Sequence, residues 1–341
     1  MTGFPEDTTA LDVWASAHVE GYAGPARAIK YPTGQSNPTY RIETPGRAYV
    51  LRCKPPGKLL KSAHMVEREF RVLRALGGVG YPVPPALALC EDESVAGSVF
   101  YVMAHVEGEI YWDPALPEQT NSQRAAIYDS MNAALAALHS VDLARSGLAD
   151  FGKPGNYFAR QTQRWTQQYR DSETATIRDM DRLIDWLAAN MPPDDGRVSL
   201  VHGDFRIDNM IFAPGSGQLL AVLDWELSTI GHPFADLAYQ CMQWRLPNAG
   251  EMRGLGGIDR VAMGLPSDEA YVAAYCQRMG LAGVPHWPFL IAFSFFRFAA
   301  ILQGVYKRAL DGNASNPERG VKLGAAVPLM ARLAMEEVEG A

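Results

Sequence analysis

The chain has 341 residues, 48% apolar and 20% charged, which is typical of a globular protein with a sizeable core. A net charge of −7 and a pI near 5.6 argue against a nucleic-acid partner, because phosphate binding requires a basic face. Residues 1–7 lack the features of a secretory signal, and the four cysteines show no paired spacing. We therefore expect a cytoplasmic protein with free thiols.

The first hundred residues are rich in strand signals. Residues 31–42 predict two strands around a loop, and residues 48–53 and 99–103 are aromatic and β-branched runs typical of buried strands. A helix is expected over 64–76, because apolar side chains recur there on one face.

From about residue 116 the helical period dominates. The longest apolar run, Leu290–Leu302, is too short to span a bilayer and contains Arg297, so it predicts a buried helix and no membrane partner. We place the joint near 104–106 and predict an α+β fold with a β-rich lobe at 1–105 and a helical lobe at 106–341.

A hairpin interrupts the helical part. Residues 201–226 hold two short apolar runs around a Pro/Gly/Ser cluster at 213–218. In an antiparallel hairpin, the residue entering the first strand lies beside the residue leaving the second, so we expect Asn209 and Asp224 to meet, with Asp204 on the preceding loop. Two oxygen ligands beside a further carboxylate suit a Mg²⁺–nucleotide site with a nearby base.

An Asp and an Asn separated by four residues on a polar loop are, by themselves, more typical of turn chemistry. Protein kinases, however, carry a His-x-Asp, an Asn after four further residues, and a metal-binding Asp at the end of the next strand. His202, Asp204, Asn209 and Asp224 follow that order within the predicted hairpin, which favours a phosphoryl-transfer site.

The motifs also support a resemblance. With His-Gly-Asp at 202–204, Asp-Trp-Glu at 224–226 and Asp-Leu-Ala at 236–238, the chain resembles the aminoglycoside phosphotransferase and choline kinase family over roughly 33–307. It looks most like the branch fused to, or encoded beside, acyl-CoA dehydrogenases. The resemblance implies a two-lobed protein-kinase-like fold and ATP with Mg²⁺ as cofactors.

The family pattern assigns the central roles. Asp204 is expected to be the catalytic base, and Asn209 and Asp224 are expected to hold Mg²⁺ against the nucleotide phosphates.

Three neighbours of these residues are expected to support them. His202 resembles the family's residue that braces the loop by hydrogen bonding. Asp236 resembles a structural Asp that hydrogen-bonds backbone near the catalytic loop, and it also suits a helix start. Glu226 is open between a second ion ligand, a residue that positions Asp204, and a solvated carboxylate.

The β-rich lobe departs from the family pattern. Arg52 occupies the strand position where the family has a phosphate-binding Lys, and Lys54 is the alternative cation. Glu69 is the expected partner of Arg52, with Glu67 second; ordinary surface ion pairs are the other interpretation.

The nucleotide contacts are also expected from the resemblance. No G-x-G-x-x-G is present, and a loop containing Gly34 and Ser36 stands in the corresponding place. The Ala104 carbonyl and the Val106 N–H are expected to bind adenine.

The segment 225–235 is too short for the activation segment of a protein kinase, so we predict a small-molecule acceptor. Arg206, Trp225 and Arg297 are candidate acceptor contacts. Aromatic candidates for the acceptor pocket are Tyr157, Trp165, Tyr239, Trp244, Trp287 and Phe296.

Several alternatives stay open. A hydroxyacyl-CoA-type acceptor, which the branch implies, would need an apolar channel with basic residues at its mouth. An aminoglycoside would need an acidic pocket and choline an aromatic cage. Arg52 in place of Lys also allows a catalytically silent nucleotide-binding module. ATP versus GTP and the oligomeric state are not decided by the sequence.

Overall fold

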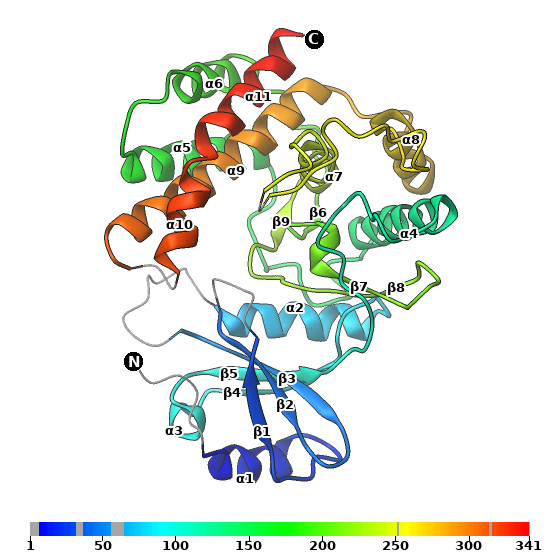
Figure 1. The fold of residues 1–341 in the computed structure, drawn as a ribbon, viewed down its shortest axis with the longest axis vertical. Helices are drawn as coiled ribbons and strands as arrows, with labels where there is room; N and C mark the ends of the chain where they lie inside the picture. Colours follow the sequence, from blue (N-terminus) through cyan, green and yellow to red (C-terminus); the bar gives the residue numbers. More distant parts are fainter. Residues whose placement is uncertain (1–6, 32–36, 56–64, 251, 314–315, 341) are drawn as a thin grey trace. The chain divides into compact units, whose positions relative to one another are not determined.

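The computed structural model describes residues 7–31, 37–55, 65–250, 252–313 and 316–340. The chain divides into two compact units (Figure 1). The first, here called the β-rich unit, comprises Met1–Ile110, Ala144–Leu148 and Asn209–Ser228; the second, the helical unit, comprises Tyr111–Leu143, Ala149–Asp208 and Thr229–Ala341. The predicted α+β layout is confirmed, with an antiparallel sheet towards the N-terminus and helices towards the C-terminus.

The β-rich unit is built on a five-stranded antiparallel sheet in the order β1-β2-β3-β5-β4. Its strands are β1 (Arg27–Lys30), β2 (Thr39–Glu43), β3 (Ala48–Cys53), β4 (Ala86–Cys90) and β5 (Phe100–Ala104). A turn at 44–47 joins β2 to β3, with the Thr44 N–H donating to the Arg47 carbonyl at 3.1 Å.

Alternation along β3 decides which way its side chains face. Tyr49 and Leu51 belong to a buried apolar cluster with Leu11 of α1 (Thr9–His18), beside the short helix α3 (Glu93–Ala96). Because successive strand residues point to opposite faces, Arg52 faces the other side, where α2 (Val66–Gly78) packs on β4 and β5 (Figure 1). The alternation along β3 thus places the Arg52 side chain on the face of the sheet that α2 covers.

The predicted hairpin forms and belongs to the β-rich unit. It consists of β7 (Met210–Phe212) and β8 (Leu219–Val222), paired in the register Met210↔Val222. Its backbone bonds to this unit through Glu109 N to Phe212 O, at 2.8 Å, and Val222 N to Pro82 O, at 2.9 Å. Gly108 permits the approach, since a Cβ there would lie 2.5 Å from the Phe212 carbonyl oxygen. The expected boundary at 105/106, which assigned the hairpin to the helical lobe, therefore differs from the observed grouping.

The helical unit surrounds one long apolar helix, α9 (Trp287–Leu310), which packs against α5, α6, α7, α10 and α11. The other elements of this unit are α4 (Asn121–His139), α5 (Tyr157–Ser172), α6 (Arg178–Ala189), β6 (Ser199–Val201), β9 (Thr229–Gly231), α7 (Phe234–Gln243), α8 (Asp268–Met279), α10 (Pro317–Gly324) and α11 (Val327–Glu339). Along the chain, the division between the two units falls within a 3₁₀ turn, η1 (Ile207–Asn209), whose last residue belongs to the β-rich unit.

Helix α9 is longer than its apolar run. It is long and apolar enough to cross a bilayer by length and composition, contrary to the prediction from Leu290–Leu302. The protein itself buries 83% of the apolar 18-residue window of α9, however. The packing is that of a core helix, as the run predicted.

Candidate active site

The loop that contains Asp204 is fixed by its backbone. It leaves β6 at His202, and the buried carboxylate of Asp236, near the start of α7, accepts two hydrogen bonds from it. The His202 N–H donates to Oδ2 at 2.7 Å, and the Gly203 N–H donates to Oδ1 at 2.8 Å. The His202 ring accepts from the Asp204 N–H at 3.1 Å. Gly203 has a φ of 85°, a conformation that glycine adopts without strain. The loop and helix α7 together fix the direction in which the Asp204 side chain points.

A buried chain of polar groups supports Asp236 from behind. His139 of α4 places Nε2 3.4 Å from Asp236 Oδ2, and its Nδ1 lies 2.7 Å from the Tyr275 hydroxyl. Burial alone would raise the pKa of Asp236, but the hydrogen bond and charge of His139, together with the neighbouring loop, hold it below its ordinary value of 3.8. Asp236 therefore stays ionised and keeps both acceptor oxygens.

Replacing Asp236 with Asn should lower the free energy of unfolding by about 1–3 kcal/mol, because one of the two buried backbone N–H groups loses its acceptor. The pKa of Asp236 in the folded state lies below its ordinary value of 3.8. The ionised carboxylate therefore contributes its full stability above pH 3.8, and this stability is lost as the pH falls through the folded-state pKa. Urea unfolding at neutral pH measures the effect. Asp129→Asn, at an exposed carboxylate paired with Arg278, is the control that should stay near wild type. Equal stabilities for both variants would contradict the bracing role.

Asp204 itself is held by two side chains. The Tyr239 hydroxyl donates to its Oδ1 at 2.8 Å, and Arg206 Nε lies 3.2 Å from the same oxygen. Burial, and then the Asp204 charge, raise the pKa of Tyr239 well above its usual range, so Tyr239 acts as a donor. Arg206 also pairs with Asp208 at 2.9 Å. The carboxylate is thus oriented in a polar setting, which suits a group that positions a hydroxyl and accepts its proton.

Arg297 braces the loop that contains Asp204. It is only 6% exposed, and its Nη1 donates to the Gly203 carbonyl at 2.7 Å. Its guanidinium lies over the rings of Trp165 and Tyr239 at 5.7 and 5.5 Å. These contacts give Arg297 a role in holding the loop, and its expected contact with the acceptor stays a prediction. That a cation inside an apolar helix requires partners is confirmed.

The β-rich unit carries the second set of predicted residues. Arg52 Nε lies 2.8 Å from Glu69 Oε2, and its Nη2 lies 2.6 Å from Asp224 Oδ1 and 3.4 Å from Glu226 Oε2. Lys54, the alternative cation, pairs with Glu67 instead. One guanidinium therefore joins the strand, helix α2 and the segment after β8.

Asp224 has an uncommon backbone. Its φ of 61° lies in the left-handed region, which residues other than glycine seldom adopt. Such residues are often found at functional sites. Next to it, the Leu223 N–H donates to the Asn209 carbonyl at 2.8 Å, which extends the hairpin pairing by one position. Within this unit, the structure thus brings the residue that enters β7 beside the segment that leaves β8.

The donor chemistry of this end of the hairpin fits Mg²⁺. Asp224, Glu226 and Asn209 offer carboxylate and amide oxygens, and the Asp224 carboxylate already faces a cation in Arg52. Among the described residues, no group of three His, Cys, Asp or Glu side chains is arranged to hold a metal ion. Mg²⁺ commonly uses one or two carboxylates together with substrate phosphates, so these residues suit a metal that arrives with a nucleotide.

Glu69 provides a pH-dependent contribution to stability. Its pKa is raised to about 7: burial is the main cause and Asp224 adds to it, whereas Arg52 lowers the pKa. The folded state therefore binds a proton that the unfolded state releases between pH 4.5 and about 7, and this group's contribution falls as the pH rises through that window.

Comparing wild type with Glu69→Gln tests this sign. The unfolding free energy of the wild type, relative to that of Glu69→Gln, should fall by up to about 1.4 kcal/mol for each pH unit between pH 5 and 7. Urea unfolding across that range measures it, and a difference that is flat with pH would contradict the raised pKa.

The remaining predicted residues have varied positions. Gly34 and Ser36 lie outside the described residues. Ala104 ends β5, and its N–H donates to the Pro85 carbonyl at 2.9 Å; Val106 follows in the connecting segment.

Trp225 is a core residue. It is 2% exposed and its indole N–H donates to the Val222 carbonyl at 3.0 Å, with Tyr81 packed edge-on against it. Its prediction as an acceptor contact is wrong, because the ring is buried within the β-rich unit.

Sequence reasoning missed the partners that hold the site. Tyr239 was considered only as a pocket wall, although it lies three positions after Asp236 and so shares a face of α7 with it. That spacing is the signal that could have found it. His139 gave no local signal, since it lies on a helix 97 positions away from Asp236.

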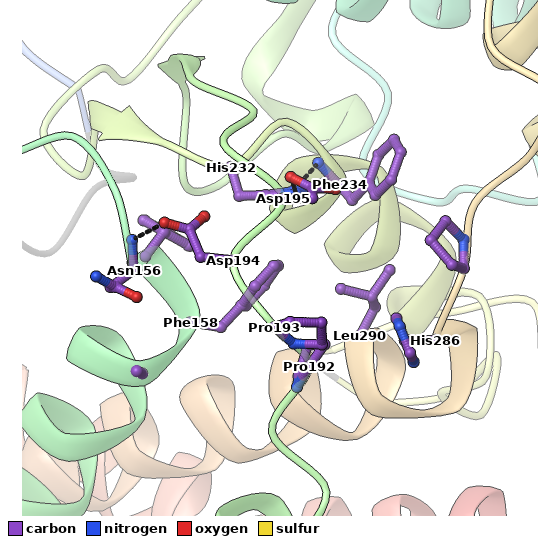
Figure 2. A pocket seen from close by; sticks show the side chains of 13 residues that line it. Asn156, Phe158, Pro192, Pro193, Asp194, Asp195, His232, Phe234, His286 and Leu290 are labelled. Carbon is purple, nitrogen blue, oxygen red and sulfur yellow. Dashed lines mark hydrogen bonds and ion pairs between the residues drawn. The ribbon is translucent and has the colours of Figure 1, made fainter.

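Figure 2 shows a pocket on the helical unit whose lining includes Tyr157, a predicted acceptor-pocket residue, but not Asp204, Asp236 or Tyr239. Several of its polar groups pair with one another: the Asn156 N–H donates to Asp194 at 2.7 Å, and His232 pairs with Asp195 at 3.1 Å. Its volume is about 50 Å³, far below the few hundred Å³ of ordinary ligand sites. We therefore do not assign it to the acceptor.

Comparison with known proteins decides the family. The sequence model of the phosphotransferase enzyme family, APH, matches residues 28–280. The chain belongs to this family. The predicted resemblance is thereby confirmed.

The related sequences are longer proteins. The chain is 52% identical over 294 residues to mouse acyl-CoA dehydrogenase family member 10 and 42% identical over 328 residues to rat member 11. It is also 43% identical to a probable acyl-CoA dehydrogenase, IBR3, of Arabidopsis thaliana. The matches cover 86%, 95% and 93% of this chain but only 27%, 42% and 41% of those proteins.

Solved structures show the same protein-kinase-like fold. A protein of Ralstonia eutropha, provisionally named an aminoglycoside phosphotransferase, has a TM-score of 0.88 at 47% identity, covering 99% of both chains. A choline kinase of Cryptosporidium parvum has a TM-score of 0.67 at 12% identity, covering 98% of this chain and 96% of that one. An aminoglycoside phosphotransferase in ternary complex with AMP-PNP and hygromycin B has a TM-score of 0.62 at 17% identity, covering 98% and 100%. At those low identities the last two support the fold alone.

Proposed function

We propose that this member of the APH family transfers the γ-phosphate of ATP to a hydroxyl group of a small molecule, with Asp204 as the base. The single observation that carries the proposal is the Asp204 carboxylate, oriented by Tyr239 at 2.8 Å on a loop that Asp236 and Arg297 fix. Such over-determination of one carboxylate is what a base needs and what a surface turn does not.

Particular residues of the chain are assigned to each part of this reaction. Phosphoryl transfer passes through a loose transition state, so positioning and electrostatics supply most of the catalysis. Asp204 orients the acceptor hydroxyl and takes its proton. Asn209 and Asp224 are proposed to hold Mg²⁺, which when bound neutralises charge on the nucleotide phosphates. Arg52, fixed by Glu69, is the proposed phosphate-binding cation of the β-rich unit.

For the acceptor we propose a hydroxyacyl thioester of the CoA type. Two observations support this choice over an aminoglycoside or choline. The related proteins are named acyl-CoA dehydrogenases, although this chain spans less than half of their length. The helical unit also has a pocket of about 210 Å³ whose side chains are mainly apolar. It is lined by Leu246, Pro247, Ala249, Gly250, Met252, Lys322, Leu323, Leu329 and Met330.

The experiment is an acceptor screen. The purified chain is incubated with Mg²⁺–ATP and either hydroxyacyl-CoAs of increasing chain length, aminoglycosides or choline, and phosphorylated product is detected by mass spectrometry. We expect product from hydroxyacyl-CoAs and a KM that falls with chain length. Product from aminoglycosides or choline alone would reject the proposed acceptor while keeping the reaction.

One observation favours a second candidate, a catalytically silent nucleotide-binding module. Arg52 replaces the family's Lys and already contacts Asp224. A thermal shift produced by Mg²⁺–ATP without ADP release under any acceptor would support the silent module; turnover with any acceptor would exclude it.

A further inference from the structure

Arg52 links two carboxylate groups of different character. On one side is Glu69, whose side chain is 2% exposed and is held by Asn37 at 2.6 Å and by the Tyr101 hydroxyl at 3.2 Å. On the other side are Asp224 and Glu226, with side chains 33% and 24% exposed. The Glu69 end is therefore fixed, and the Asp224 end is accessible.

The fork of an arginine is what makes this link. Arg52 Nε forms an ion pair with Glu69, and Nη2 contacts both carboxylates beyond β8. A lysine carries its charge on one ammonium nitrogen, which cannot lie beside carboxylates at two separate positions as two nitrogens of a guanidinium can. Arg52 therefore contacts Asp224 and Glu69 at the same time.

We propose that Arg52 is a resident counter-cation of the candidate metal site, which competes with a divalent cation for Asp224 and is received by Glu226 when Asp224 is released. The proposal rests on the proposed function only for the identity of the site. The competition follows from charge, because two cations on one carboxylate repel each other. The hand-over follows from geometry, since Nη2 lies 2.6 Å from Asp224 and already 3.4 Å from Glu226.

The competition is tested with Mn²⁺ alone, without nucleotide, by counting free Mn²⁺ with electron paramagnetic resonance. Removing a positive charge beside a carboxylate raises its affinity for a proton by about 10- to 1,000-fold. Because Mn²⁺ is also a cation, we expect Arg52→Gln to bind Mn²⁺ at least about tenfold more tightly than the wild type. Arg41→Gln is the matched control, since Arg41 lies on neighbouring β2 and is 40% exposed in a pair with Glu43. It should bind as wild type does.

Arg52→Lys covers the case in which Arg52→Gln does not fold. It keeps a cation for Glu69 but loses the fork, so it too should bind Mn²⁺ more tightly than wild type. Unchanged or weaker Mn²⁺ binding in the folded Arg52 variants, or no Mn²⁺ binding in any protein, would overturn the competition.

The role of Glu226 is tested by a double-mutant cycle. Glu226→Gln should weaken Mn²⁺ binding in the wild-type background, because Arg52 Nη2 then has no carboxylate besides Asp224, and it should have little effect in Arg52→Gln. Equal weakening in both backgrounds would identify Glu226 as a direct ligand and overturn the hand-over. These readouts need no turnover, so a failed acceptor screen would reject the proposed function and leave this result standing.

Discussion

Replacing Asp204 with Asn is expected to lower kcat for phosphate transfer by about 10²–10⁴-fold, the usual contribution of a positioned acid or base, while the Kd for ATP stays unchanged. Asn keeps the size of the side chain and still accepts the Tyr239 hydroxyl, but it cannot take a proton. Steady-state kinetics and isothermal titration with ATP measure the two quantities separately.

Asp208→Asn is the matched control for this variant. Asp208 lies on the same loop and pairs with the same Arg206 at 2.9 Å, so it reports any general effect of removing a carboxylate there. We expect it to retain most activity. A similar loss in both variants, or a parallel loss of ATP binding in Asp204→Asn, would remove Asp204 from the role of base.

Asp224→Asn is expected to abolish the dependence of nucleotide binding on Mg²⁺. Loss of a metal ligand should weaken Mg²⁺–nucleotide binding by at least about tenfold, since even the outer partners of metal ligands cost that much when removed. Asn is also suited to the left-handed backbone at this position, so the fold should survive. Titration of AMP-PNP with Mg²⁺ and then with EDTA measures the difference.

The control for Asp224→Asn is Asp92→Asn in the same unit. Asp92 caps α3 by accepting from the Ser94 N–H, and Asn is an equally good cap, so this variant should bind as wild type does. An Asp224→Asn protein that still binds AMP-PNP more tightly with Mg²⁺ than with EDTA would exclude Asp224 as a metal ligand.

The parts of the site that depend on local sequence were predictable. The hairpin follows from turn residues between apolar runs, and its register places Asn209 beside the residues after β8. Strand alternation likewise places Arg52 towards α2, where Glu69 occupies a buried position on the helix face. Both are short-range periodicities that a single sequence contains.

The parts that depend on distant packing were not predictable. Arg297 braces the Gly203 carbonyl from 94 positions away, and nothing in the apolar pattern of α9 specifies that acceptor. The sequence predicts Trp225 as an acceptor contact, because neither composition nor spacing shows that Tyr81 packs against it. The hairpin's grouping with the β-rich unit depends on backbone bonds to Glu109 and Pro82, which have no signature in side-chain type.

The most direct test of the central claim is phosphorus NMR of the reaction of wild-type chain with Mg²⁺–ATP and a hydroxyacyl-CoA. The account predicts that an acceptor phosphomonoester and ADP appear together, and that both are absent with Asp204→Asn or after addition of EDTA. Formation of the phosphomonoester at the wild-type rate by Asp204→Asn, or without a divalent cation, would contradict it.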